Sequence, residues 1–421
     1  MTAAYTSELA EALSADVLDR LLRYVRIDTQ SDRAHAGSPS TPGQLELARL
    51  LRDELEGLGL ADVAIDVNGF VTATLPGNVD GAPVIGLLAH LDTSPDESGR
   101  NVEPLVHRDY DGGVIALPRN GTVLDPASMP ELTPKVGHDI VSTSGDTLLG
   151  ADDKAGMAEV MAAVAYLAAH PELPRDTVRV AFTPDEEIGE GAKLFDIERF
   201  GAVCAYTLDG SEAGEFTDET FTAASADLVI RGVDVHPGFA TGKLVNASRL
   251  AGRVLAELPA ELTPEATSER EGFIHVWAVE STAGKATIRT IVRDFDDERL
   301  AEHVALLRRI AEEAVATEPR ARLEIEVKHQ YSNMRRFLDD HPDVSAAAEE
   351  ALRREGYEPR RVPIRGGTDG SILSARGLPT PNIFTGGHEF HSVREWASVQ
   401  DMASAAAVAV RLAGVWAERA G

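Results

Sequence analysis

Two adjacent carboxylates in a turn of small residues are the part of the sequence best suited to chemistry. Asp152 and Asp153 lie in the stretch LLGADDKAG, and apolar residues at helical spacing follow between Met157 and Leu167. A helix start needs a single Asp or Ser as its N-cap and has no need of an Asp pair in a glycine-containing turn. We therefore expect Asp152 to have another task, such as bridging two metal ions.

Four further imidazole and carboxylate side chains are candidate metal ligands: His90, Glu187, Asp209 and His391. Imidazole suits zinc, and carboxylates supply negative charge and can bridge two ions. Together with Asp152 they are too many ligands for one open catalytic site. They suit two metal ions about 3.5–4 Å apart that share one carboxylate. We expect Asp152 to be the shared ligand and the other four residues to divide two and two.

Two more carboxylates lie next to these ligands in the sequence. Glu186 precedes Glu187, and a two-metal hydrolase needs a general base for water and a proton donor for the leaving amine, so Glu186 is the candidate. Asp92 follows His90 by two residues and could accept the second ring N–H of that histidine. Each motif alone has an ordinary explanation as a solvated loop or a turn. The prediction rests on their combination.

Four apolar segments must position these residues, and we interpret them as buried strands. They span residues 84–89, 178–182, 202–208 and 380–384. Each is followed by polar residues at its C-terminal end, which is where ligand sites lie in open α/β sheets. The sequence therefore predicts an α/β catalytic domain with its site along one edge of a sheet.

The pattern changes between residues 218 and 330. Strands are predicted at 226–231, 272–279, 287–293 and 323–328, and helices at 247–258 and 298–315. This order is the β-α-β-β-α-β arrangement. We predict a catalytic domain of residues 1–217 and 331–421, with a mixed sheet flanked by helices, and an inserted α+β domain of residues 218–330.

Two helices are predicted before the first buried strand. Ser14 is the expected N-cap of a helix that continues to Arg26. Thr41-Pro42 gives the second helix a cap followed by proline at its first position.

Composition excludes several classes of partner. The 421 residues contain 69 acids and 40 bases, for a net charge of −29, which argues against nucleic acid and against an anionic membrane surface. One cysteine, Cys204, excludes an intrachain disulfide and fits a reducing compartment. The first residues lack the features of a signal peptide, and no apolar run reaches the roughly 18 residues of a membrane span. We expect a cytosolic protein.

Several longer stretches carry a family resemblance: LLAHLDTSPD, TLLGADDKAG, AFTPDEEIG, VHPGFATGKLVNA, PIRGGTDGS and PNIFTGGHEFH. From about residue 15 to 415 the chain resembles the peptidase T family. These cytosolic aminotripeptidases belong to a two-zinc superfamily with the carboxypeptidase G and acetylornithine deacetylase types. The resemblance implies two zinc ions per subunit, a small peptide substrate, and a homodimer formed through an inserted domain that also acts as a lid.

The resemblance also implies individual roles. His90 and Asp209 would bind one zinc, Glu187 and His391 the other, and Asp152 would bridge them beside a cis peptide bond to Asp153. Asp92 would orient His90, and Glu186 would be the general acid and base. His236 matches a histidine that reaches the active site from the other subunit or after closure, where it could stabilise the oxyanion. Five residues in matching stretches could bind the peptide: Arg365, Asn246, Arg293, Tyr331 and Asn333. An arginine suits the terminal carboxylate of the peptide.

One stretch departs from the family pattern, in which an aromatic residue precedes the metal histidine and a second histidine follows it. In this chain His388 precedes His391, and Arg394 follows it. Alignment selects His391 as the ligand, and it leaves the role of His388 open.

Our main hypothesis is a zinc aminopeptidase that releases the N-terminal residue of tripeptides. A dipeptidase, a carboxypeptidase or an N-acyl amino acid deacylase of the same superfamily would keep the chemistry and change the substrate, and it would cleave N-blocked compounds. A catalytically inactive metal-binding scaffold would be favoured by loss of Glu186 or a ligand, and none is lost here.

Overall fold

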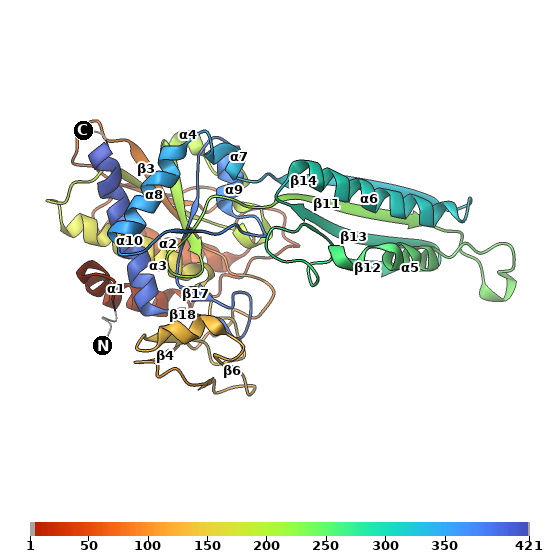
Figure 1. Ribbon diagram of the computed structural model, residues 1–421, viewed down its shortest axis with the longest axis horizontal. Coiled ribbons are helices and arrows are strands. Elements are labelled where there is room, and N and C mark those ends of the chain that lie inside the picture. The colour runs from red at the N-terminus through yellow and green to blue at the C-terminus, as the bar shows by residue number, and fades with distance from the viewer. Residues whose placement is uncertain (1–4, 420–421) are drawn as a thin grey trace. The chain divides into compact units, whose positions relative to one another are not determined.

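The computed structural model describes residues 5–419, and its backbone contacts divide the chain into two units (Figure 1). The first unit runs to Asp218 and also contains Phe337–Val362 and the chain from Thr368 onwards. The second unit contains Glu219–Arg336 and the short segment Pro363–Gly367.

The first unit is built on an eight-stranded mixed sheet with the order β1-β2-β8-β3-β9-β16-β10-β15. Its strands are β1 (Ala61–Ile65), β2 (Val71–Leu75), β3 (Val84–His90), β8 (Thr177–Thr183), β9 (Cys204–Gly210), β10 (Glu215–Thr217), β15 (Arg360–Arg361) and β16 (Asn382–Phe384). The four strands predicted from apolar segments are neighbours and run parallel as β8-β3-β9-β16. Their C-terminal ends therefore meet along one edge, and the predicted α/β class is confirmed.

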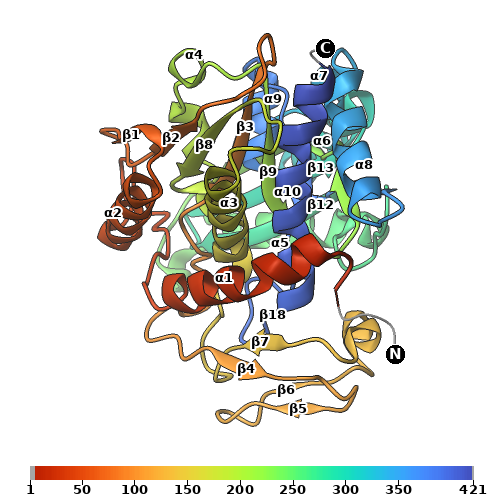
Figure 2. The same cartoon turned by 90° about the vertical axis from the view of Figure 1, so that its left-hand side faces the viewer.

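Helices cover this sheet (Figure 2). The longer ones are α1 (Glu8–Tyr24), α2 (Pro42–Gly57), α3 (Ala151–Ala169), α8 (Pro342–Arg354) and α10 (Val399–Arg419); the short ones are α4 (Ile197–Phe200), α7 (Arg335–Leu338) and α9 (Asp369–Ala375). Helices α3 and α10 pack side by side and are buried over most of their length, as expected for helices with apolar residues on nearly every face. Between residues 5 and 419, no helix combines the length and the apolar character that a membrane span requires.

Helix α1 begins earlier than the sequence indicated. Ser7, not Ser14, is its N-cap, because the Ser7 hydroxyl accepts the Ala10 N–H at 3.0 Å. Ser14 lies inside the helix and donates its hydroxyl to the Glu11 carbonyl, a bond that a mid-helix serine can make without ending the helix. Helix α2 begins at Pro42, as predicted.

A smaller sheet and a hairpin of the first unit were not predicted. The sheet has the order β17-β18-β7-β4, and the hairpin pairs β5 with β6. These strands are β4 (Leu105–His107), β5 (Ile115–Ala116), β6 (Val123–Leu124), β7 (Ile140–Ser142), β17 (Gly387–His388) and β18 (Trp396–Ser398). Short 3₁₀ helices complete the chain: η1 (Pro130–Lys135), η2 (Glu186–Ile188), η3 (Gly191–Leu194), η4 (Pro237–Phe239) and η5 (Ala260–Leu262).

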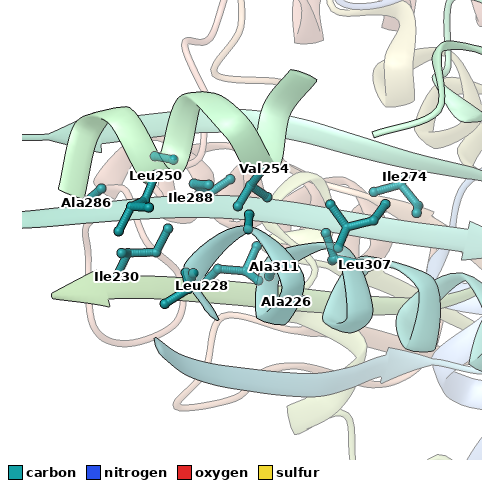
Figure 3. Packing of buried hydrophobic residues seen from close by; sticks show 14 of the residues in the cluster. Ala226, Leu228, Ile230, Leu250, Val254, Ile274, Ala286, Ile288, Leu307 and Ala311 are labelled. Carbon is teal, nitrogen blue, oxygen red and sulfur yellow. The ribbon is translucent and has the colours of Figure 1, made fainter. Parts of the chain in front are cut away.

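The second unit has the predicted β-α-β-β-α-β order. Its elements are β11 (Thr222–Arg231), α5 (Ala247–Glu257), β12 (Phe273–Ser281), β13 (Lys285–Asp294), α6 (Asp297–Ala316) and β14 (Arg322–Tyr331). The strands form an antiparallel sheet with the order β12-β13-β11-β14. Both helices pack on one face, where Leu228 and Ile288 of the sheet share a core with Val254 of α5 and Leu307 of α6 (Figure 3).

The segment Pro363–Gly367 joins the second unit through backbone pairing. The N–H of Phe221 donates to the Ile364 carbonyl at 3.1 Å, and the N–H of Ile364 donates to the Glu219 carbonyl at 3.0 Å. The Glu219 carboxylate in turn forms ion pairs with Arg270 and Arg335. The second unit is therefore assembled from two separate parts of the chain.

Candidate metal centre

The five predicted ligands converge at the C-terminal edge of the large sheet. His90 ends β3, Asp209 lies near the end of β9, and Glu187 lies in η2, directly after β8. Asp152 lies at the start of α3, and His391 lies in the loop between β17 and β18. Parallel strands thus bring together groups that are far apart in the sequence.

Asp152 lies between the two histidines. Its Oδ1 is 2.8 Å from His90 Nε2, and its Oδ2 is 3.1 Å from His391 Nε2. On the first side, Asp209 Oδ1 is 3.7 Å from His90 Nε2. On the second side, Glu187 Oε2 is 3.0 Å from His391 Nε2. The five residues therefore form two groups of ligand atoms that share the carboxylate of Asp152.

Asp153 also belongs to this cluster, although no role was predicted for its side chain. Its Oδ2 accepts the backbone N–H of His90 at 3.0 Å, and its Oδ1 accepts the Gly156 N–H at 3.2 Å. Ligand atoms of His90, Asp153 and Asp209 lie within 4.8 Å of one another, as do those of His90, Asp152 and Glu187. The adjacent acidic pair thus provides one carboxylate that faces both histidines and one that fixes the backbone of His90.

The turn that carries Asp152 needs small residues. Gly150 has a φ of 81°, which favours glycine. At Gly156 a Cβ atom would lie 1.8 Å from the Leu208 carbonyl oxygen, so only glycine allows α3 to approach β9 this closely. The peptide bond between Asp152 and Asp153 is cis, as the resemblance implied.

Asp92 connects His90 with the loop that carries Glu186. His90 Nδ1 lies 3.0 Å from the Asp92 backbone carbonyl oxygen and 3.4 Å from its carboxylate Oδ1. The same carboxylate accepts the N–H groups of Glu186 at 2.9 Å and Glu187 at 3.1 Å. Asp92 is fully buried. It therefore contacts the histidine mainly through its backbone and fixes the η2 loop through its side chain.

Asp185, the residue before Glu186, also holds the η2 loop in place. It has a φ of 58°, and its carboxylate accepts the Ser40 N–H at 2.9 Å and the Gln44 side-chain amide at 2.8 Å. The backbone around Glu186 and Glu187 is thus held by two carboxylates from different parts of the fold.

Burial and mutual repulsion dominate the electrostatics of the cluster. Burial raises the pKa of Asp209 and of Glu186, and neighbouring carboxylates add to both increases. Burial likewise raises the pKa of Glu187 to about 7, with a contribution from Asp152. Burial also works to raise the pKa of Asp152, but hydrogen bonds from His391 and His90 hold it well below its usual range.

This donor set fits a pair of divalent cations. Glu187 Oε1 is buried and has no hydrogen-bond partner in the described part of the chain. Imidazole nitrogens and carboxylate oxygens are the donors that zinc and similar ions take. A cation also offsets the repulsion that raises the pKa values of the carboxylates. The structure therefore contains a candidate metal centre, with Asp152 at its middle.

His388 lies apart from this centre. It is buried, its ring stacks on Trp396 with 4.2 Å between centroids, and its Nδ1 lies 3.4 Å from the Ser211 hydroxyl. Burial lowers the pKa of His388 to about 4, so the ring is neutral near neutral pH. Of the two histidines in this loop, His391 is the one beside Asp152.

The remaining predicted residues belong to the second unit. His236 is exposed, and its Nδ1 accepts the Gly238 N–H at 3.1 Å. Asn246 is the N-cap of α5, where its side-chain oxygen accepts the Arg249 N–H at 3.2 Å. Arg293 is buried and donates to the Ala224 and Val292 carbonyls, with its guanidinium 5.4 Å from the centre of the Tyr331 ring.

Asn333 and Arg365 are tied to their own unit by several hydrogen bonds. The Asn333 amide donates to the Phe295 carbonyl at 3.1 Å, and its oxygen accepts the Thr220 N–H at 3.2 Å. The Arg365 guanidinium donates to the Thr267 carbonyl at 2.8 Å and to the Glu271 carbonyl at 3.0 Å. These contacts explain the position of both side chains without a ligand.

The sequence of this chain is similar to those of known peptidases. The model of peptidase family M20/M25/M40 matches residues 148–414. Peptidase T of Vibrio parahaemolyticus is 46% identical over 406 residues, which cover 96% of this chain and 99% of that protein. Peptidase T of Shouchella clausii is 47% identical over 409 residues, which cover 97% of this chain and 100% of the relative.

The chain belongs to the peptidase family M20/M25/M40.

Solved structures of this M20/M25/M40 family agree in fold. The aminopeptidase PepT from Bacillus cereus superposes with a TM-score of 0.74 at 25% identity, covering 96% of this chain and 99% of the other. The YXEP protein of Bacillus subtilis, described as a dinuclear metal-binding M20 peptidase, gives a TM-score of 0.65 at 17% identity, covering 97% and 99%. The resemblance to peptidase T expected from the sequence is confirmed. This M20/M25/M40 family member is a peptidase.

Proposed function

We propose that this peptidase is a two-zinc aminopeptidase that releases the N-terminal residue of tripeptides. One observation carries the proposal: Asp152 directs its two carboxylate oxygens at His90 and His391, and each histidine has a further carboxylate beside it. A shared carboxylate flanked by two ligand groups is the arrangement of two-metal hydrolases. The near full-length similarity to peptidase T supports the tripeptide substrate.

In this proposal His90 and Asp209 would hold one zinc ion, Glu187 and His391 would hold the other, and Asp152 would be a ligand of both. When bound, the ions supply Lewis acidity that polarises the scissile carbonyl and acidifies water. Asp92 keeps His90 oriented and Glu186 in reach of the reaction, through the hydrogen bonds described above.

Glu186 is the proposed general acid and base. Its carboxylate takes a proton from the attacking water and gives it to the nitrogen of the leaving peptide. The geometry that supports this role is the position of Glu186 between Asp185 and Glu187 in η2, where the Asp92 carboxylate fixes its backbone.

The second unit is the proposed lid. His236 would donate a hydrogen bond to the developing oxyanion, from a second subunit or after closure. The residues that would bind the ends of the peptide are Arg365, Asn246, Arg293, Tyr331 and Asn333. Arg365 suits the terminal carboxylate, which a guanidinium binds through two parallel hydrogen bonds. Its present partners are backbone carbonyls and a threonine hydroxyl, and a peptide carboxylate could replace them.

We also propose a homodimer formed through the second unit. Within residues 5–419, β14 pairs only with β11, so its other edge is open to another strand. A groove of about 410 Å³ lies beside it, lined by Leu300 and Val304 of α6 and Val327 of β14. The cytosol is the proposed location, supported by a single buried cysteine that suits a reducing compartment.

A substrate panel with metal analysis tests the proposal. Purified protein is loaded with zinc, its metal content is measured, and it is given trialanine, N-acetyl-trialanine, dialanine and tetraalanine with and without a chelator. We expect two zinc ions per chain, cleavage of trialanine at its first peptide bond, and little activity on the acetylated compound. Chelation should abolish the activity, and added zinc should restore it.

Each other pattern of results identifies a different function. Preferred cleavage of N-acetyl-trialanine indicates a deacylase or carboxypeptidase, and preferred cleavage of dialanine indicates a dipeptidase. Bound metal without hydrolysis of any compound indicates an inactive scaffold. Activity that ignores the chelator would refute the two-zinc proposal.

A further inference from the structure

Glu395 is a buried glutamate whose carboxylate binds the turn in front of Asp152. It precedes β18 and is 1% exposed. Its Oε2 accepts the N–H groups of Leu149 and Gly150, each at 2.7 Å, and its Oε1 accepts the Asp152 N–H at 3.0 Å. Three backbone donors therefore point at a single side chain that is about 240 residues distant along the chain.

One of these donors, the Asp152 N–H, lies in the first turn of α3, and the other two, those of Leu149 and Gly150, precede the helix. The first N–H groups of a helix lack carbonyl acceptors within the helix and usually receive a side-chain cap. Gly150 precedes α3 and provides no side chain, and Asp152 and Asp153 have non-helical backbone angles. A carboxylate at such a helix start is favoured by hydrogen bonding and by the helix dipole. Glu395 thus takes the place of the missing cap.

The loop between β17 and β18, which carries Glu395, also contacts the side chain of Asp152. His391 Nε2 lies 3.1 Å from Asp152 Oδ2, and Glu395 Oε1 accepts the Asp152 backbone N–H. The loop is compact, because the Glu395 N–H donates to the Ser392 carbonyl at 3.2 Å and the Ser392 hydroxyl donates to the Glu389 carbonyl at 2.7 Å. One loop therefore fixes both the backbone and one carboxylate oxygen of Asp152.

We propose that Glu395 is a positioning residue of the metal centre: by holding the N–H groups of Leu149, Gly150 and Asp152, it keeps the Asp152 carboxylate aimed at both histidines. This inference rests on the proposed two-zinc function. Among residues 5–419, the hydrogen bonds of the Glu395 carboxylate go to backbone N–H groups and not to the side chain of a candidate ligand. It acts through the backbone, in the way that outer residues orient the ligands of many metal sites.

Glu395→Gln is the most discriminating variant. The amide has the same shape but only one acceptor oxygen, so its NH₂ group would face either the Asp152 N–H or the N–H pair of Leu149 and Gly150. Zinc affinity is measured by competition with a chromophoric chelator, and the cobalt-substituted protein gives a visible spectrum that reports ligand geometry. We expect Glu395→Gln to bind zinc about 10- to 100-fold more weakly at one of its two sites, with an altered cobalt spectrum.

Glu355→Gln is the matched control. Glu355 is also 1% exposed, and its carboxylate accepts from the Thr6 and Ser7 hydroxyls and from Arg411 Nε. Replacing this carboxylate by an amide disturbs three hydrogen bonds in the first unit, the same number as in Glu395→Gln. We expect Glu355→Gln to lower the melting temperature and to leave zinc affinity and the cobalt spectrum unchanged.

The outcomes separate this inference from the proposed function. Wild-type protein that binds no metal would refute the two-zinc proposal. Wild-type binding with the same affinity and cobalt spectrum in Glu395→Gln would refute only the role of Glu395. If Glu395→Gln does not fold, Glu395→Asp, which keeps the charge and withdraws it by one methylene, takes its place with the same expected loss. Failure of both variants to fold would assign Glu395 to folding and overturn the proposal.

Discussion

The carboxylate of Asp92 accepts the backbone N–H of Glu186 at 2.9 Å. Asp92 stands two residues after a candidate ligand, His90, and Glu186 stands one residue before another, Glu187. Their hydrogen bond therefore connects the ends of the neighbouring strands β3 and β8. Movement of either strand end would change the distance between the candidate metal centre and its proposed general base.

Changing Asp92 to Asn should reduce zinc binding and turnover more than it reduces the stability of the fold. An asparagine keeps the size of the side chain but replaces one acceptor oxygen with a donor that faces the Glu186 or Glu187 N–H. We expect zinc affinity or kcat to fall about 10- to 100-fold. Metal competition and tripeptide kinetics measure the two effects.

Asp66 gives a control for Asp92. Its carboxylate also accepts two backbone N–H groups in a turn of the first unit, those of Asn68 and Phe70. Asp66→Asn should change neither zinc affinity nor kcat. Equal effects of the two variants would show that Asp92 has a general structural role and no specific one at the centre.

Changing Glu186 to Gln should remove turnover while zinc stays bound. The amide cannot accept or deliver the proton, and general acid–base catalysis contributes about 10²- to 10⁴-fold to rate. We expect kcat to fall by that factor with unchanged metal content. The control is Glu190→Gln, since Glu190 is exposed and forms an ion pair with Lys193 on the surface. Undiminished turnover in Glu186→Gln would remove Glu186 from the mechanism.

Asp176 should make stability depend on pH. It is fully buried, neither carboxylate oxygen has a partner among the described residues, and burial raises the pKa of Asp176 to about 9. Burial also raises the pKa of the Cys204 thiol, and the Asp176 carboxylate contributes to that increase. The folded chain therefore keeps a proton that the unfolded chain releases above about pH 4, so this group's contribution to stability falls as pH rises from about 4 to 9.

Asp176→Asn removes this titration. We expect the variant to gain stability over wild type as pH rises, by roughly 1 kcal/mol for each pH unit between about pH 4 and pH 8, with little difference near pH 4. Thermal unfolding across the pH range measures it. The exposed Asp62→Asn is the control and should follow wild type. A constant difference between Asp176→Asn and wild type at every pH would contradict the buried-proton explanation.

Arg365 should contribute to the stability of the second unit. Its guanidinium bonds to Thr267 and Glu271 and lies over the rings of Phe221 and Phe273. We expect Arg365→Ala to lower the free energy of unfolding by about 2 kcal/mol, because the carbonyls of Thr267 and Glu271 lose a charged donor. Denaturant unfolding measures this loss, with the exposed Arg299→Ala as control.

Tripeptide kinetics on the same Arg365 variant test its proposed contact with the peptide carboxylate. A rise in KM together with the loss of stability would assign both roles to Arg365. A rise in KM with unchanged stability would contradict the structural role.

The large features of the fold followed from the sequence because their patterns are long. The four strands β3, β8, β9 and β16 are apolar and end in polar residues, and parallel neighbours must gather those ends at one edge. For the same reason the structure brings His90, Glu187 and Asp209 together, and Asp152 joins them from the start of α3 and His391 from the loop between β17 and β18. The order of the second unit could be predicted because its helices and most of its strands are long enough to show periodicity.

Shorter and longer-range features could not be predicted. Strands of two or three residues, such as β5 and β7, carry no period, so the smaller sheet was missed. Ser7 and Ser14 are equally good caps by type, and only tertiary packing extends α1 back to Glu8. Asp92 was expected to reach His90 with its carboxylate, whereas its main partners belong to the η2 loop. Glu395 binds a turn that is distant in the sequence, and no local pattern signals such a pair.

The segment Pro363–Gly367 belongs to the second unit. In the sequence it is separated from Glu219–Arg336 by Phe337–Val362, a stretch that belongs to the first unit. Recombination or gene fusion that copied Glu219–Arg336 as one cassette would leave behind Ile364 and Arg365, and with them the strand partner of Phe221. Transfer of the second unit alone would therefore need two separate stretches of coding sequence.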